Sequence, residues 1–179
     1  TDLPELNLLT DRPNSLNFAS QTCTRSFSLT ETNAIKTLAK QSGATVFMLL
    51  LAIFKLLLHR YSNQQDIAVG VPVAGRNSAA VAPLVGFFVN TLVIRSQINT
   101  TLLFPEWLKQ VQSTLSEALQ HQDMPFPDVV EAVGVDRISG KTPLFRVMFQ
   151  VQSSGYQLQN AEQLSSGLLG DMPGLSLSQ

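Results

Sequence analysis

The sequence predicts a fold of the α/β or α+β class, with a mixed β-sheet flanked by helices. Long helical patterns are interspersed with short apolar strands along the 179 residues. The strands at residues 66–73 and 87–95 are apolar on both faces, which is typical of the middle of a sheet. The sequence contains no internal repeat, and its length suits one ordinary domain or one lobe of a larger one.

The first elements follow an irregular N-terminal stretch. Residues 1–20 contain Pro4 and Pro13 without periodicity, which predicts an extended linker. A short strand is expected at residues 24–29. A helix follows it, with Thr30 as N-cap and Gly43 just past the helix end.

The next helix, at residues 46–59, is apolar nearly all round and is therefore expected to be buried, with Thr45 as its cap. After a turn, the strand at residues 66–73 is expected to end near Pro72. The segment 74–83 is predicted to be a loop.

The second half of the chain continues this alternation. The strand at residues 87–95 precedes the most regular helix, residues 104–121, and a short helix at residues 126–134. Further strands are expected at residues 144–152 and 174–178. Because each of the apolar strands resembles a central strand, the sheet needs neighbours that this sequence offers only sparingly.

The charge content of the chain argues against some classes of binding partner. Charged residues make up 14% of the chain against a usual share of about 25%, and the formal net charge is −1. Without a basic cluster, the chain has no electrostatic footprint for nucleic acid or an acidic membrane. The longest apolar run, residues 46–58, is shorter than the about 20 residues of a membrane span. The single cysteine, Cys23, favours a reducing, cytoplasmic compartment.

Common catalytic constellations are missing from the sequence. It has no Gly-x-Ser-x-Gly elbow, phosphate loop or His-Glu-x-x-His pair. Metal binding needs clustered ligands, but His59 and His121 lie in separate helices. Structural roles are the simpler interpretation for both histidines and for Cys23 and Trp107. No catalytic residue and no metal ligand is predicted.

Asn90 is the most unusual residue of the predicted strands, because it is a polar amide in the apolar run LVGFFVNTLVIR, residues 84–95. An amide at such a place costs about 1–3 kcal/mol without hydrogen-bond partners. It is therefore either satisfied inside the fold or directed at a site.

Three phrases resemble motifs of the condensation domains of non-ribosomal peptide synthetases. LVGFFVNTLVIR is similar to that family's Gly-x-Phe-Val-Asn-Thr motif, and HQDMPFPDVVE, residues 121–131, to its His-Gln-Asp-x-Pro-Phe motif. DRISGKTPLFRVMFQVQ, residues 136–152, resembles the Arg-x-x-Ser-x-x-Pro-Leu-Phe stretch and the strand after it. The order and spacing agree over essentially the whole chain.

The resemblance implies a lobe like chloramphenicol acetyltransferase, one of two that form a V around a tunnel. Partner peptidyl carrier domains would present substrates on 4′-phosphopantetheine arms at the two tunnel mouths, and an adjacent adenylation domain would select monomers. An amine on one arm attacks the thioester on the other, so an amide forms. No cofactor is expected to bind directly to this chain.

The family's catalytic motif, His-His-x-x-x-Asp-Gly, belongs to the first lobe and is absent here, since His59 precedes Arg60 and His121 precedes Gln122. The chain is therefore expected to be a piece of the second lobe, inactive without the N-terminal condensation lobe. Residues 1–20 would be an inter-lobe linker, and residues 21–179 a C-terminal lobe truncated at its end.

By the resemblance, candidates for the substrate tunnel or the inter-lobe cleft are Asn90, Thr91, Gly75, Arg76, Gln122 and Asp123. Asn90 would bind the opposite lobe or a substrate carbonyl, or else be satisfied within its own lobe. Asp123 would alternatively cap the turn after it. Arg137 would pair within the lobe or contact a neighbouring domain.

Two other functions stay open. The chain is alternatively a non-catalytic docking or scaffold lobe that binds carrier or adjacent synthetase domains. A relative that forms esters, closes rings or epimerises is the third hypothesis, although ring-closing and epimerising relatives normally carry altered motifs.

Overall fold

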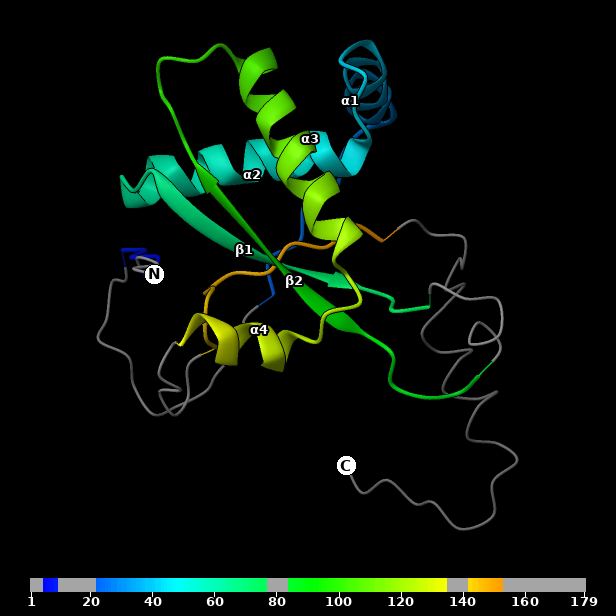
Figure 1. Cartoon of the computed structure of the whole chain (residues 1–179). Coiled ribbons are helices and arrows are strands. Elements are labelled where there is room, and N and C mark those ends of the chain that lie inside the picture. The colour runs from blue at the N-terminus through cyan, green and yellow to red at the C-terminus, as the bar shows by residue number, and fades with distance from the viewer. Residues whose placement is uncertain (1–4, 10–21, 77–83, 135–141, 153–179) are drawn as a thin grey trace.

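The computed structural model describes residues 5–9, 22–76, 84–134 and 142–152. Four helices and two strands are assigned within these ranges: α1 (Leu29–Gln41), α2 (Val46–Ser62), β1 (Asp66–Val73), β2 (Asn90–Gln97), α3 (Phe104–Gln120) and α4 (Phe126–Val133). Helices α2 and α3 lie on one face of the sheet, and α4 lies on the other (Figure 1). The predicted class, helices flanking a sheet, is confirmed.

The sheet assigned within the described residues has two antiparallel strands, and one isolated parallel bridge is its only sign there of the predicted mixed sheet. β1 and β2 are antiparallel, with Asp66 opposite Gln97 and Val73 opposite Asn90. On the other side of β1 the chain forms a parallel bridge between Gly70 and Met148. The strand predicted at residues 144–152 is thus reduced to a single bridge in the structure, and β2 begins at Asn90 instead of residue 87.

The larger core lies between the sheet and helices α2 and α3. Alternate residues of β1 and β2 point into it, as the period of two of a strand requires. Its fully buried members come from both helices and both strands and include Leu49, Leu51, Val69, Ile94, Leu108 and Val111. The Trp107 indole is also buried there and donates a hydrogen bond to the Ala52 carbonyl oxygen at 3.1 Å, so its predicted structural role is confirmed.

A smaller core covers the opposite face of the sheet. Ala68, Val130, Leu144 and Phe145 are buried together. Gly70 allows this packing, since a Cβ there would lie 2.6 Å from the Phe145 ring. The smaller core fixes α4 against the sheet.

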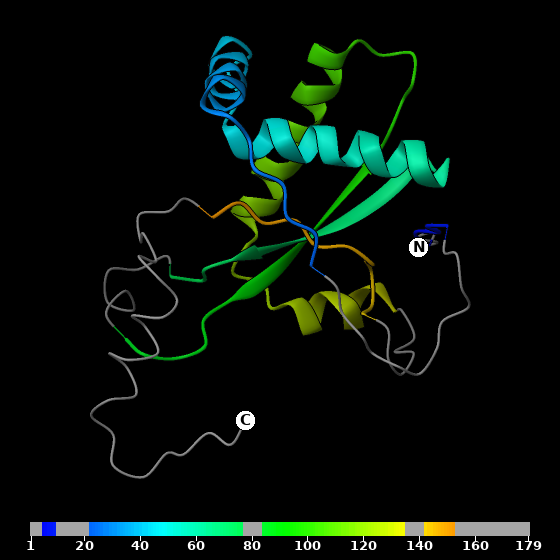
Figure 2. The ribbon, with the colours of Figure 1, turned by 180° about the vertical axis from the view of Figure 1, so that it is seen from behind.

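The start of α1 corrects two predictions. Residues 22–28 do not form the strand expected at residues 24–29, and every residue from 22 to 30 is exposed. The N-cap is Ser28 and not Thr30: the Ser28 hydroxyl accepts from the Glu31 amide, and the Glu31 carboxylate accepts from the Ser28 amide. This reciprocal pair is a capping box, and it satisfies two backbone donors at the helix start, which a cap at Thr30 would not do. Figure 2 shows segment 22–28 running from α1 toward the sheet.

The remaining helices follow the predictions closely. Thr45 caps α2, which continues to Ser62 and ends at Asn63 in a left-handed conformation, with φ 55°. The expectation that α2 is buried is only partly correct, because Ile53, Leu57 and Tyr61 form an exposed apolar stripe. Helix α3 ends one residue earlier than predicted, and α4 ends before Gly134.

Part of the predicted linker is attached to the lobe. Leu6 is buried in the larger core, and the Asn7 amide donates to the Gln64 side chain at 2.7 Å. Glu5 forms an ion pair with Arg146 at 3.0 Å. The rest of the linker, most of the loop at 74–83, Arg137 and the strand expected at residues 174–178 lie outside the described residues.

Candidate functional site

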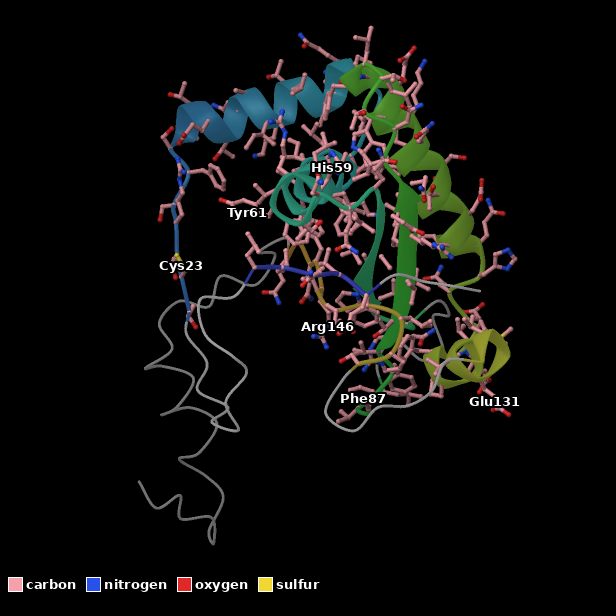
Figure 3. The ribbon with its side chains drawn as sticks, turned by 90° about the vertical axis from the view of Figure 1, so that its left-hand side faces the viewer. Cys23, His59, Tyr61, Phe87, Glu131 and Arg146 are labelled. Carbon is pink, nitrogen blue, oxygen red and sulfur yellow. The ribbon has the colours of Figure 1, made fainter. Side chains whose placement is uncertain are left out.

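The candidate residues lie at one end of the sheet, where β1 ends and β2 begins, and in the turn between α3 and α4. Antiparallel pairing places the end of β1 beside Asn90, the first residue of β2. His59 lies at the opposite end, where its Nδ1 is 2.7 Å from the Gln64 carbonyl oxygen. Figure 3 shows Phe87 and His59 at these two ends. His59 therefore does not belong to the candidate site.

Asn90 is satisfied within its own lobe. Its side-chain Nδ2 donates to the carbonyl oxygens of Gln122 at 2.9 Å and Met124 at 2.7 Å. Its Oδ1 accepts from the Phe126 amide at 3.0 Å. An asparagine side chain has two N–H donors, so both are used. Of the two roles that the sequence left open, the geometry favours the internal one.

The contact with Phe126 also completes α4. The first amides of a helix need acceptors from outside the helix. At α4 the N-cap is Pro125, which makes no side-chain cap hydrogen bond. Asn90 supplies the missing acceptor from β2, 36 residues earlier in the chain. It thus acts as an N-cap from another element.

Gly75 and Arg76 close the connection between β1 and β2. Gly75 has φ +63°, and a Cβ there would lie 1.9 Å from the Phe88 carbonyl oxygen. The Arg76 guanidinium lies 4.4 Å from the Phe88 ring centroid and donates to the carbonyl oxygens of Leu84 and Gly86 at 2.8 and 3.5 Å. These contacts fix both ends of the connection against each other.

The structure brings the candidates together to different degrees. Gln122 contacts Asn90 through its backbone carbonyl, and its side chain is half-buried. Asp123 is exposed on the same turn. Thr91 is half-buried opposite Pro72. Gly75 and Arg76 meet this group through Phe88, two residues before Asn90.

Around these polar contacts, the sheet end presents exposed apolar side chains. Val85 is fully exposed and Phe87 is 90% exposed. Leu84, Val89 and Met124 are each about half exposed, and the five are called the apolar rim below. An exposed apolar group of this kind is typical of an interaction surface.

Sequence reasoning missed Lys55, whose side chain is fully buried beneath the sheet. Its amine donates to the Ile94 carbonyl oxygen at 2.7 Å and to the Ser96 hydroxyl at 2.6 Å. Burial lowers the pKa of the Lys55 amine to about 7, and attraction by the Asp66 carboxylate opposes this shift. The signal was present in the sequence, because Lys55 alone interrupts the apolar run 46–58.

The side chains of Asn90 and Arg76 hold backbone carbonyl oxygens, and the apolar rim is exposed beside them. Within the ranges that the structure describes, no three His, Cys, Asp or Glu side chains gather as metal ligands would. Over the same ranges, none of the helices is by itself both long and apolar enough for a membrane span; α1 and α2 meet that criterion only as a pair bent by 100°.

Comparison with known proteins identifies the family. The family model of the Condensation domain matches residues 1–175. Tyrocidine synthase 3 of Brevibacillus parabrevis is 40% identical over 155 residues, which is 86% of this chain and 2% of that protein. Gramicidin S synthase 2 of Brevibacillus brevis is 39% identical over 160 residues, which is 88% of this chain and 4% of that protein. The chain therefore spans only a small part of these relatives.

Solved structures agree on the fold. A four-domain nonribosomal peptide synthetase bound to AMP and glycine matches 69% of this chain and 10% of that one, with a TM-score of 0.66 and 34% identity. The condensation domain of the Monacolin K polyketide synthase matches 82% of this chain and 36% of that one, with a TM-score of 0.65 and 24% identity, which supports the fold alone. The chloramphenicol-acetyltransferase-like lobe that the motifs implied is thus confirmed.

Proposed function

The chain belongs to the condensation-domain family of non-ribosomal peptide synthetases, and on that premise we propose that it forms part of the second lobe of a domain that makes amide bonds. The substrates would be aminoacyl or peptidyl thioesters held by carrier domains. The proposal rests on one observation above all: the family match runs through both motif segments that meet at Asn90. Residues 1–20 would be the inter-lobe linker and residues 21–179 the lobe.

In this role the chain would contribute part of the wall around the substrates, and it would not provide the catalytic acid or base. Asn90 cannot take up a proton usefully at neutral pH, because its side chain is an amide. The N-terminal lobe, with its His-His-x-x-x-Asp-Gly motif, would position or deprotonate the attacking amine. We propose Asn90, Thr91, Gly75, Arg76, Gln122 and Asp123 as the part of the tunnel wall or cleft that this lobe contributes.

The apolar rim is the surface that the N-terminal lobe would cover. Its side chains project from a backbone that Arg76 and Asn90 hold in place. Burial of apolar surface stabilises association by about 25 cal/mol per Å². A rim that is already ordered loses little conformational entropy when it binds.

Other partners follow from the same family. Carrier domains would bring the 4′-phosphopantetheine arms, and an adenylation domain would lie next to the condensation domain, in the cytoplasm. Arg76 is the basic residue among the candidates, and its guanidinium is engaged by two carbonyl oxygens and an aromatic ring. The structure therefore offers no support for direct binding of the arm's phosphate by Arg76.

A reconstituted reaction tests the proposal. Two carrier domains loaded with aminoacyl groups are mixed with this chain alone, or with this chain, a separately made N-terminal lobe and the C-terminal segment that the family resemblance implies. The dipeptidyl product is measured by intact-protein mass spectrometry. We expect product only in the complete mixture, and its loss when the second histidine of the catalytic motif is replaced. Product from this chain alone would contradict the proposal. Assembly of the lobes without product would favour the scaffold function.

A matched pair of variants tests the docking surface. Phe87→Ser removes a side chain of the apolar rim, and Leu57→Ser removes one from the exposed stripe of α2. We expect Phe87→Ser to weaken binding of the N-terminal lobe about tenfold or more, as measured by calorimetry, and Leu57→Ser to leave it within about twofold. The opposite order would place the lobe interface on α2.

A further inference from the structure

We propose that Asn90 is a positioning residue of the condensation site, which acts by holding the turn at residues 121–125 and the start of α4 in place instead of by binding substrate. The inference deepens the proposed function and rests on it. Its starting point is that a single side chain connects three backbone groups across two other parts of the chain.

The hydrogen-bond inventory of Asn90 leaves no donor for a substrate. One N–H of Nδ2 reaches the Gln122 carbonyl oxygen and the other reaches that of Met124. To donate to a substrate carbonyl, Asn90 would have to release one of these oxygens, and the part-buried Gln122 oxygen would then lose its hydrogen bond from Asn90. The geometry therefore assigns Asn90 to the turn.

The turn also has backbone hydrogen bonds of its own. They include the Met124 amide to the His121 carbonyl oxygen at 3.1 Å and the Gln122 amide to that of Leu119 at 3.4 Å. Asn90 adds a restraint from β2 on both sides of Asp123. The side chains of Gln122 and Asp123 would be the groups whose placement depends on it.

Two substitutions distinguish the contacts of Asn90 with the turn from its contact with the start of α4. Asn90→Ala removes the contacts with both carbonyl oxygens and with the Phe126 amide. Asn90→Asp keeps an oxygen for the Phe126 amide, and negative charge at a helix start is favourable. Its ionised carboxylate cannot donate, so it repels the oxygens of Gln122 and Met124. Asn90→Asp should therefore release the turn and leave α4 capped.

Amide hydrogen exchange of the 179-residue chain measures the loss of these two kinds of contact directly. In Asn90→Ala we expect the amides of both Met124 and Phe126 to exchange about tenfold faster than in wild type. In Asn90→Asp only the Met124 amide should accelerate. The matched control is Asn99→Ala, since the Asn99 side chain also holds a turn, through the Thr101 amide at 3.0 Å, but after the opposite end of β2. It should leave both amides unchanged.

Protonation provides a signature that simple loss of stability would not give. A protonated Asp at position 90 regains one donor for a carbonyl oxygen, and the nearby oxygens raise the pKa of its carboxyl group. We therefore expect Asn90→Asp to recover turn protection and condensation rate as the pH falls toward about 5, relative to Asn90→Ala at the same pH. The rates are compared in the reconstituted two-lobe reaction, at a temperature where every variant is folded.

The outcomes are distinct. Rates that fall about tenfold in step with faster exchange at Met124, and that recover together in Asn90→Asp at low pH, support the proposal. A lower rate with unchanged exchange would overturn it and make Asn90 a substrate ligand. Faster exchange with an unchanged rate would also overturn it, because the turn would not matter to the reaction. If wild type gives no product, the proposed function itself fails, whereas the exchange data still measure the turn.

Discussion

The larger core and the sheet end around Asn90 differ in what holds them together. Beneath α2 and α3 the chain is held by apolar packing, and its most buried side chains come from helices and strands alike. At the sheet end, polar side chains hold backbone: Asn90 and Arg76 each reach two carbonyl oxygens. The first region determines whether the chain folds, and the second where its loops lie.

Substitutions in the two regions should therefore have different effects, one on the stability of the whole lobe and the other on local order. Loss of a buried methylene lowers the free energy of unfolding of the whole lobe, because the cavity that it leaves is only partly filled. Loss of a polar contact to a turn changes local order, since surface turns open without global unfolding. Substitutions in each region can test this contrast.

The largest effect is expected in the larger core. Leu49→Ala removes a fully buried side chain of α2 and should lower the free energy of unfolding by about 2–5 kcal/mol. Leu57→Ala, on the same helix but half exposed, should cost less than about 1 kcal/mol. Urea denaturation measures both. Equal losses would show that the stripe on α2 is part of the core.

Lys55 should make the stability of the same core depend on pH. Its pKa is about 7 in the folded chain and 10.5 for an ordinary lysine amine, so the unfolded chain binds more protons between these values. Stability should therefore rise with pH from about 7 toward about 10, by up to about 1.4 kcal/mol per unit, and the amine's unfavourable contribution is fully present below about pH 7.

Lys55→Met removes this titration, and urea denaturation at about pH 7, 8 and 9 should show a flatter slope than in wild type. The exposed Lys109 is a matched control on α3, because Lys109→Met should retain the wild-type slope. An unchanged slope in Lys55→Met would mean that the buried amine keeps an ordinary pKa.

A further loss of stability is expected at the strand-end connection. Gly75 and Gly43 have nearly the same backbone, φ +63° and +61°, but a Cβ meets the Phe88 carbonyl oxygen only at Gly75. Both alanine variants carry the cost of a left-handed residue, and Gly75→Ala should cost about 1–3 kcal/mol more. Thermal unfolding compares them. Equal losses would indicate that the connection yields easily and that Arg76 does not fix it.

Much of the fold could be predicted because apolar spacing and caps are local properties. The spacing of apolar residues located α2, α3 and α4 to within a few residues, and DIAVGVPV is β1 at its predicted bounds. The strand expected at residues 24–29 failed because a Ser28–Glu31 capping box competes with it for the same residues. The third strand is only a bridge, since pairing depends on neighbours that local sequence does not encode.

The motif resemblance nominated the candidate residues, but the sequence did not predict how these residues connect. The motif resemblance selected Asn90 and Gln122, which the structure joins through a backbone carbonyl. Nothing in the spacing of 32 residues between them indicates that contact. Lys55 was missed for the opposite reason, because a lysine in an apolar helix is ordinarily assigned to the surface.

The burial of Lys55 also makes its acylation rate a measure of transient opening of the core. Amine-acylating reagents modify the neutral form of lysine, and this amine is neutral at a lower pH than usual, yet its two hydrogen bonds and the surrounding core exclude the reagent. Acylation at Lys55 can proceed only while α2 and β2 are apart. The acylation rate, followed by peptide mapping, would therefore report how often α2 and β2 separate. Binding of a second lobe to the apolar rim should lower this rate.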